Sequence, residues 1–138
     1  MLTTLILSPD LRAQFAAAAR AAFPHECCGL IEGVREGASV QVLALRPTAN
    51  FSESPDSFEI DPAAHLRLIR ELRGSGREIV GCYHSHPRGL PVLSDHDRER
   101  GETEGFVWLI AALADAAATP EFAAFKGAAF RPLALSRA

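Results

Sequence analysis

The stretch GCYHSHPRGLPVLSDHDRER, residues 81–100, joins an apolar, strand-like run to a turn and then to a charged segment. Two of the five histidines, His84 and His86, stand one residue apart in this stretch, and Pro87 follows them. The histidines therefore lie where a buried strand meets a loop, which is a common position for binding and catalytic residues. The pattern predicts a strand over REIVGCYHSH, residues 77–86.

Residues two apart on a β-strand project from the same face, so we expect His84 and His86 to lie side by side with Cys82. Tyr83 and Ser85 then point to the opposite face. Two imidazoles on one face can bind one divalent ion, and a catalytic zinc takes three protein ligands and a water molecule. The third ligand has to come from another element.

The segment SDHD, residues 94–97, offers that ligand. If Ser94 caps a helix, Asp97 lies roughly 60° around the helix axis from Ser94, and Asp95 points almost oppositely to Asp97. Only one of the two aspartates can then share a site with Ser94, and Asp97 is the natural candidate. A simpler interpretation is that Ser94 is an N-cap followed by an acidic residue, in a near-match to a capping box.

Two helices are predicted from their start signals. Ser8 as N-cap and Pro9 in the first turn begin one helix, which ends before Pro24. Asp61 and Pro62 begin the second helix. The apolar residues of the second helix that we expect to face inward are Leu66, Ile69 and Leu72.

The remaining patterns predict strands. CCGLIEG and SVQVLALRP read as a β-hairpin, FEI as a brief strand, FVWLIAAL as a buried strand, and FAAFKGAAFRPL as two paired strands with a turn near Gly127. Residues 94–101 are expected to begin or to form a third helix. The sum is a single α+β domain over residues 1–138, with a mixed, mostly antiparallel sheet flanked by two or three helices.

Composition excludes several classes of protein. The net charge of −3 with scattered arginines gives no basic surface for nucleic acid. No apolar run reaches the roughly 18 residues of a membrane span, and the start lacks the features of a signal peptide, so we expect a soluble, cytoplasmic protein. Three cysteines, with Cys27 and Cys28 adjacent, fit reduced thiols better than a disulfide framework.

The spacing of HSHPRGLPVLSDHD, which is His-x-His, seven residues, Ser, two residues and Asp, resembles the signature of the JAMM or MPN+ zinc metalloproteases. The family also has an upstream glutamate, and PHECCGLIEG places Glu26 there. The similarity continues through PTAN and FEIDP, covers most of residues 8–115, and is greatest to the short bacterial members. It implies a JAB/MPN fold, which is cytidine deaminase-like.

The resemblance also implies a role for each matching residue. His84, His86 and Asp97 would hold Zn²⁺, and Glu26 would be the general base rather than a ligand. Ser94 would donate a hydrogen bond to the developing oxyanion. Glu26 and Ser94 are therefore expected to be catalytic, and the two histidines and Asp97 to bind the metal. Many relatives have Pro before this serine, where the present chain has Leu93, but the difference removes no functional side chain.

The family hydrolyses amide bonds at the C-terminus of ubiquitin-like proteins, and similar bacterial members act on small sulfur-carrier proteins. The resemblance thus implies a zinc metallopeptidase that cleaves a peptide or isopeptide bond at a Gly-Gly tail, with the loops TANFSESPDSFE and PRGLPVL as candidates for contact with the tail. The oligomeric state and the identity of the carrier protein stay open.

Three other functions are alternatives to this one. A non-catalytic MPN-type binding module would bind zinc without turnover. A zinc hydrolase of a small amide, such as a deaminase, could use the same zinc and glutamate, but the Cys-x-x-Cys ligands of those deaminases are absent. A cysteine hydrolase using Cys82 is disfavoured, because this residue is expected beneath the histidines.

Overall fold

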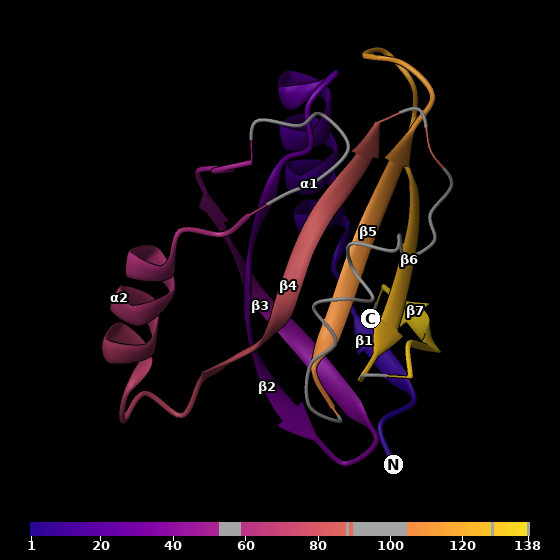
Figure 1. The fold of residues 1–138 in the computed structure, drawn as a ribbon. Helices are drawn as coiled ribbons and strands as arrows, with labels where there is room; N and C mark the ends of the chain where they lie inside the picture. Colours follow the sequence, from indigo (N-terminus) through magenta and orange to yellow (C-terminus); the bar gives the residue numbers. More distant parts are fainter. Residues whose placement is uncertain (53–58, 88, 90–104, 128, 138) are drawn as a thin grey trace.

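The computed structural model describes residues 1–52, 59–87, 89, 105–127 and 129–137. Helices and strands follow one another along the chain as drawn in Figure 1. None of the helices in these ranges is long and apolar enough to cross a bilayer. The elements are β1 Thr4–Ile6, α1 Pro9–Ala22, β2 Cys28–Glu36, β3 Ser39–Thr48, α2 Pro62–Leu72, β4 Glu78–Pro87, β5 Val107–Leu113, β6 Glu121–Lys126 and β7 Arg131–Ser136.

The strands form one mixed sheet in the order β1-β3-β2-β4-β5-β6-β7, and this sheet closes into a barrel. Its antiparallel pairs are β2–β3, β2–β4, β5–β6 and β6–β7, whereas β1–β3, β1–β7 and β4–β5 are parallel. The sequence predicted a mixed sheet, which the structure confirms, but it did not predict the closure into a barrel. Closure depends on the three-residue strand β1, which pairs with β3 on one side and β7 on the other.

The start signals of both predicted helices are confirmed. Ser8 caps α1 by accepting a hydrogen bond from the Leu11 N–H at 3.3 Å, and Asp61 caps α2 by accepting from the Ala63 N–H at 2.9 Å. The third helix expected at residues 94–101 lies outside the described residues. The described part of the chain thus contains two helices.

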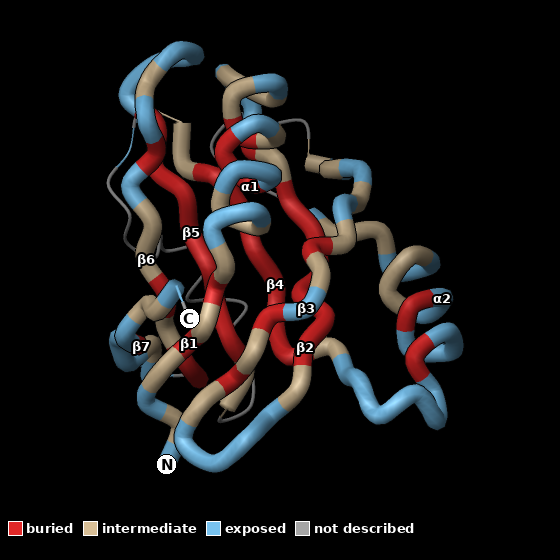
Figure 2. The backbone as a smooth tube through the Cα atoms, turned by 180° about the vertical axis from the view of Figure 1, so that it is seen from behind, coloured by how far each residue is buried: buried red, intermediate tan, exposed pale blue. Residues whose placement is uncertain are grey.

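The inner face of the sheet carries the larger apolar core, and α1 packs against it (Figure 2). The ring of Phe15 on α1 meets the ring of Tyr83 on β4 edge-on, with centroids 4.9 Å apart. Tyr83 belongs to this inner core, whereas its neighbour Cys82 belongs to a second apolar cluster with α2. Successive residues of β4 therefore face opposite sides, as the strand pattern predicted.

The buried face of α2 matches the expected one only at Leu72, which is buried as predicted. Leu68 and Leu72 are buried in the second cluster, while Leu66 and Ile69 are 47% and 44% exposed. The sequence places apolar residues on both sides of this helix, so periodicity alone allows either stripe to face the sheet. Leu68 and Leu72, which are four residues apart, form the stripe that packs in the second apolar cluster.

The strand β4 is held closely between its neighbours. A Cβ at Gly81 would lie 1.9 Å from the Val107 carbonyl oxygen of β5, so only glycine permits this approach of the two backbones. A Cβ at Gly29 of β2 would lie 2.5 Å from the ring of Tyr83. These contacts fix the strand that carries His84 and His86.

A buried carboxylate joins β2, β3 and the segment before β4. The side chain of Glu32 is 1% exposed, and its two oxygens pair with Arg46 and Arg77 at 2.7 Å each. Burial alone would raise the pKa of Glu32, but the hydrogen bonds from Arg77 and Arg46 outweigh it and hold that pKa below its usual value. The network ties together strands that also build the candidate site.

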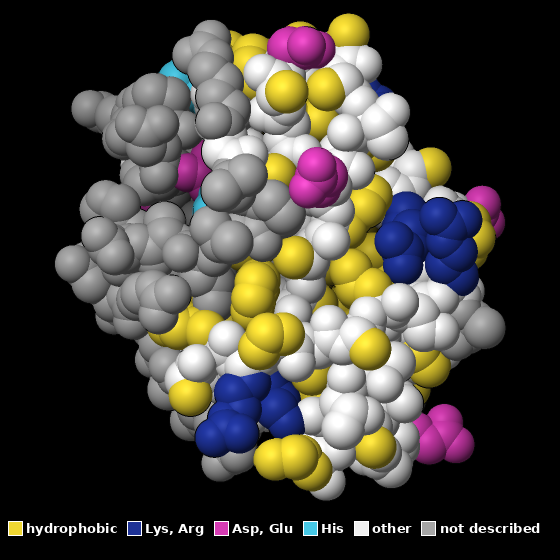
Figure 3. Space-filling model, turned by 90° about the vertical axis from the view of Figure 1, so that its right-hand side faces the viewer, with side chains coloured by type: hydrophobic (Ala, Val, Ile, Leu, Met, Phe, Trp, Pro, Cys, Tyr) yellow, Lys and Arg dark blue, Asp and Glu magenta, His cyan; other side chains and the backbone are white. Residues whose placement is uncertain are grey.

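Of the brief strand predicted at FEI, Phe58 lies outside the described residues, and Ile60 forms an isolated bridge with Asn50. In the view of Figure 3, the Lys and Arg side chains lie in separate groups rather than in a continuous band.

Candidate metal centre

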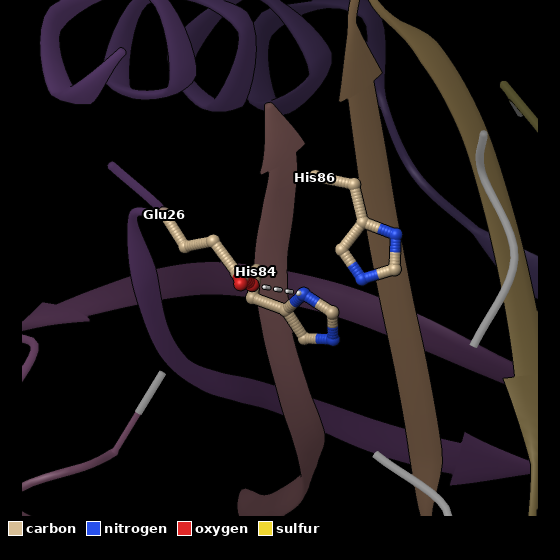
Figure 4. A group of neighbouring side chains, drawn as sticks. All are labelled: Glu26, His84 and His86. Carbon is tan, nitrogen blue, oxygen red and sulfur yellow. Dashed lines mark ion pairs between the residues drawn. The ribbon is translucent and has the colours of Figure 1, made fainter. Parts of the chain in front are cut away.

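The C-terminal end of β4 presents two imidazoles on one face. The ring centroids of His84 and His86 lie 4.7 Å apart, and the two planes are inclined by 40° (Figure 4). His84 is fully buried, whereas His86 is partly exposed. The side-by-side placement predicted from their spacing is confirmed.

Glu26 reaches this pair from the segment that precedes β2. Its Oε1 lies 3.2 Å from His84 Nδ1, and its side chain is 3% exposed (Figure 4). A carboxylate that follows Pro24 could equally be an exposed loop residue, and its burial excludes that interpretation. The chain therefore brings the predicted general base into contact with a predicted metal ligand.

These three side chains form a group whose chemistry fits zinc. One potential ligand atom from each of Glu26, His84 and His86 lies within 4.8 Å of the other two. Neutral imidazoles and a carboxylate are common zinc ligands, and donor atoms around a tetrahedral zinc lie roughly 3 to 4 Å apart. The described residues thus supply two histidine ligands and one carboxylate that is close enough either to bind the ion or to act beside it.

The other two predicted site residues, Ser94 and Asp97, lie outside the described residues. Their roles as oxyanion donor and third ligand stay predictions. Whether Glu26 acts as a base or as a ligand depends on Asp97. A catalytic zinc takes three protein ligands, and without Glu26 the third has to be Asp97.

The cysteines do not compete for this role. Cys28 packs in the second apolar cluster and Cys27 against the inner core, so the two adjacent side chains face opposite sides. Burial raises the pKa of the Cys27 thiol to about 11, although hydrogen bonding to Ser85 acts in the opposite direction. Cys27 is therefore a neutral thiol at neutral pH, which is a poor nucleophile.

Two residues beside Glu26 were not recognised from the sequence. Asn50 donates a hydrogen bond to the Glu26 carbonyl, and Ser85 accepts one from the Cys27 N–H. In the sequence, Asn50 appeared only as the last residue of the PTAN segment, and Ser85 only as a residue on the face opposite the histidines. Because their partners are backbone groups, the sequence did not show what they bind.

Known structures share this fold. A protein from Desulfitobacterium hafniense, known from a solution structure, aligns over 97% of this chain and 91% of its own, with a TM-score of 0.80 and 28% identity. A JAB1/MPN domain protein from Archaeoglobus fulgidus aligns over 99% of this chain and 95% of its own, with a TM-score of 0.57 and 17% identity. The fold and the site together define a JAB/MPN domain.

The chain belongs to the prokaryotic homologs of the JAB domain, whose family model matches residues 8–126. It is 36% identical over 88 residues to a desampylase of Haloferax volcanii, which is 63% of this chain and 62% of that protein. It is 35% identical over 75 residues to a probable TtuB-protein conjugate cleaving protease of Thermus thermophilus, which is 54% of this chain and 47% of that protein. The matched segments thus span about half to two thirds of these relatives.

Proposed function

We propose that this protein is a zinc-dependent metallopeptidase that hydrolyses a peptide or isopeptide bond at the C-terminal Gly-Gly tail of a ubiquitin-like or sulfur-carrier protein. The observation that carries the proposal is the contact of Glu26 with His84, beside His86, in a member of the JAB family. The names of the relatives support hydrolysis of protein conjugates.

In this proposal His84, His86 and Asp97 hold the zinc. When bound, zinc lowers the pKa of its water to about 7 and polarises a substrate carbonyl, so hydroxide is supplied at neutral pH. The burial of His84 keeps its ring in one orientation and limits the access of bulk water. A water-poor site also strengthens each electrostatic interaction within it.

Glu26 moves the proton. Its carboxylate takes a proton from the attacking water and later delivers it to the leaving amine. Glu26 can contact His84 and still accept a hydrogen bond from water, because a carboxylate has two oxygens and about four acceptor positions. Ser94 donates a hydrogen bond to the oxyanion, a contribution that is worth about 3 to 4 kcal/mol in other hydrolases.

A Gly-Gly tail suits such a site because an extended segment without side chains can enter a narrow groove and pair with a sheet edge. The loops at residues 48–59 and 87–93 flank the site in sequence and are the proposed contacts for the tail. Of these loops the structure describes residues 48–52, 59, 87 and 89.

The test is a cleavage assay on a ubiquitin-like protein that ends in Gly-Gly, joined either to a reporter peptide or to a lysine side chain. We expect mass spectrometry to show zinc-dependent cleavage after the second glycine of at least one substrate. Chelation should abolish cleavage and added zinc should restore it. Zinc binding without cleavage of either bond would favour the binding module, and cleavage confined to small amides would favour the small-amide hydrolase.

A further inference from the structure

The peptide group between Glu26 and Cys27 lies just outside the sheet. The first paired residue of β2 is Cys28, which pairs with Thr48 of β3 and with His84 of β4. Backbone N–H and C=O groups that are buried beyond a ladder need other partners. Two side chains supply them here, one on each edge of the same peptide plane.

Asn50 holds the carbonyl edge. Its Nδ2 donates to the Glu26 carbonyl oxygen at 2.9 Å, and its Oδ1 accepts from the N–H groups of Ser52 and Glu59, both at 2.9 Å. Exchanging the amide oxygen and nitrogen would place an NH₂ group against two N–H donors, so these partners determine the orientation of the amide. Asn50 therefore links the backbone of Glu26 to the backbone of Ser52 and Glu59.

Ser85 holds the amide edge. Its Oγ accepts from the Cys27 N–H at 2.9 Å, and its own N–H donates to the Cys27 carbonyl at 3.0 Å. Ser85 is fully buried, so no solvent competes for either bond. The residue between the two histidines thus fixes the backbone next to Glu26 and couples that backbone to the strand of His84 and His86.

We propose that Asn50 and Ser85 are positioning residues that act on catalysis through Glu26. This inference rests on the proposed function, in which Glu26 is the base. With both edges of its peptide held, the Glu26 side chain starts from a fixed backbone and reaches His84 at 3.2 Å. Proton transfer needs such placement, because a misplacement of about 1 Å can lower a rate by about 100-fold.

The test compares Asn50→Asp and Ser85→Ala with the wild type. Asn50→Asp keeps an acceptor for Ser52 and Glu59 but sets a carboxylate oxygen against the Glu26 carbonyl. Gln41→Glu is the matched control, because it makes the same amide-to-carboxylate change on β3 at a partly buried position, where the amide donates to the Val42 carbonyl. All assays are run well below the melting temperature of each variant.

We expect kcat to fall by at least about tenfold in both variants, with KM and zinc content within about twofold of the wild type. Hydrogen exchange of the Cys27 amide in the metal-free protein gives a second readout, and it should accelerate by about tenfold or more in Ser85→Ala. The control should match the wild type in each measurement.

Two results would overturn the inference. One is a kcat within about twofold of the wild type in both variants. The other is a loss of zinc in parallel with the loss of kcat, which would mean that the two residues support the metal site as a whole. If the wild type itself cleaves neither substrate, the proposed function fails instead, and the exchange rates alone still decide whether Ser85 holds the peptide.

Discussion

Glu26 Oε1 lies 3.2 Å from His84 Nδ1, and both side chains are almost completely buried. A buried carboxylate is unfavourable unless it is paired or hydrogen-bonded. The contact places the carboxylate against the His84 ring and beside the face that His86 shares. Glu26 is thus a buried carboxylate within the candidate metal centre.

Replacing His86 should weaken zinc binding. We expect His86→Ala to raise the zinc dissociation constant by more than about 100-fold, because even the loss of an outer partner of a ligand costs 10- to 100-fold. Competition with a chromophoric chelator measures this constant. His65→Ala is the control, because His65 lies on α2 and not on β4 or in the segment that carries Glu26. Equal affinities for His86→Ala and the control would exclude His86 as a ligand.

Replacing Glu32 should destabilise the fold. Glu32→Gln removes the charge that pairs with Arg46 and Arg77, and we expect a loss of about 2 to 3 kcal/mol in the free energy of unfolding at pH 7. The partly exposed arginines keep this below the cost of breaking a fully buried pair. Glu78→Gln, which breaks an exposed pair with Arg35, should cost less than about 1 kcal/mol.

The effect of Glu32 should depend on pH. Its pKa is lower in the folded protein than in the unfolded chain, so its contribution is fully present above the unfolded value of about 4.3 and is lost as the pH falls through the folded value. Urea unfolding of wild type and Glu32→Gln at pH 7 and at pH 3 measures this. We expect the difference between them to shrink at pH 3, and an unchanged difference would contradict the ion-pair account.

The Cys27 thiol should be unreactive at neutral pH. Its pKa is raised by burial to about 11, so the rate of alkylation at this residue should increase roughly tenfold for each pH unit between 7 and 9. Peptide mapping after labelling with iodoacetamide measures that rate. A rate that is already at its plateau at pH 7 would show a thiolate at Cys27 and would contradict the effect of burial.

The sequence predicted local features better than long-range ones. The helix starts at Ser8 and Asp61 were predictable because a cap and its partner are close in sequence. Closure of the barrel was not predictable, because Thr4 pairs with both Ser39 and Ala134. A run as short as β1 gains its strand conformation from these distant partners and not from its own pattern.

In the candidate site, too, features within one element were predictable and contacts between distant elements were not. The alternation rule alone placed His84 and His86 together, since both lie on one strand. Glu26 was found only through the resemblance to a family, because a carboxylate after a proline carries no signal of its own. The contacts of Asn50 and Ser85 with the backbone became visible only in three dimensions.

The most direct test of the account pairs metal analysis with the cleavage assay for wild type and Glu26→Gln. The amide keeps the size of the side chain but cannot accept a proton as a base. We expect Glu26→Gln to bind as much zinc as the wild type and to lose at least about 100-fold in turnover. Equal turnover would remove Glu26 from the mechanism, and loss of zinc would make it a ligand.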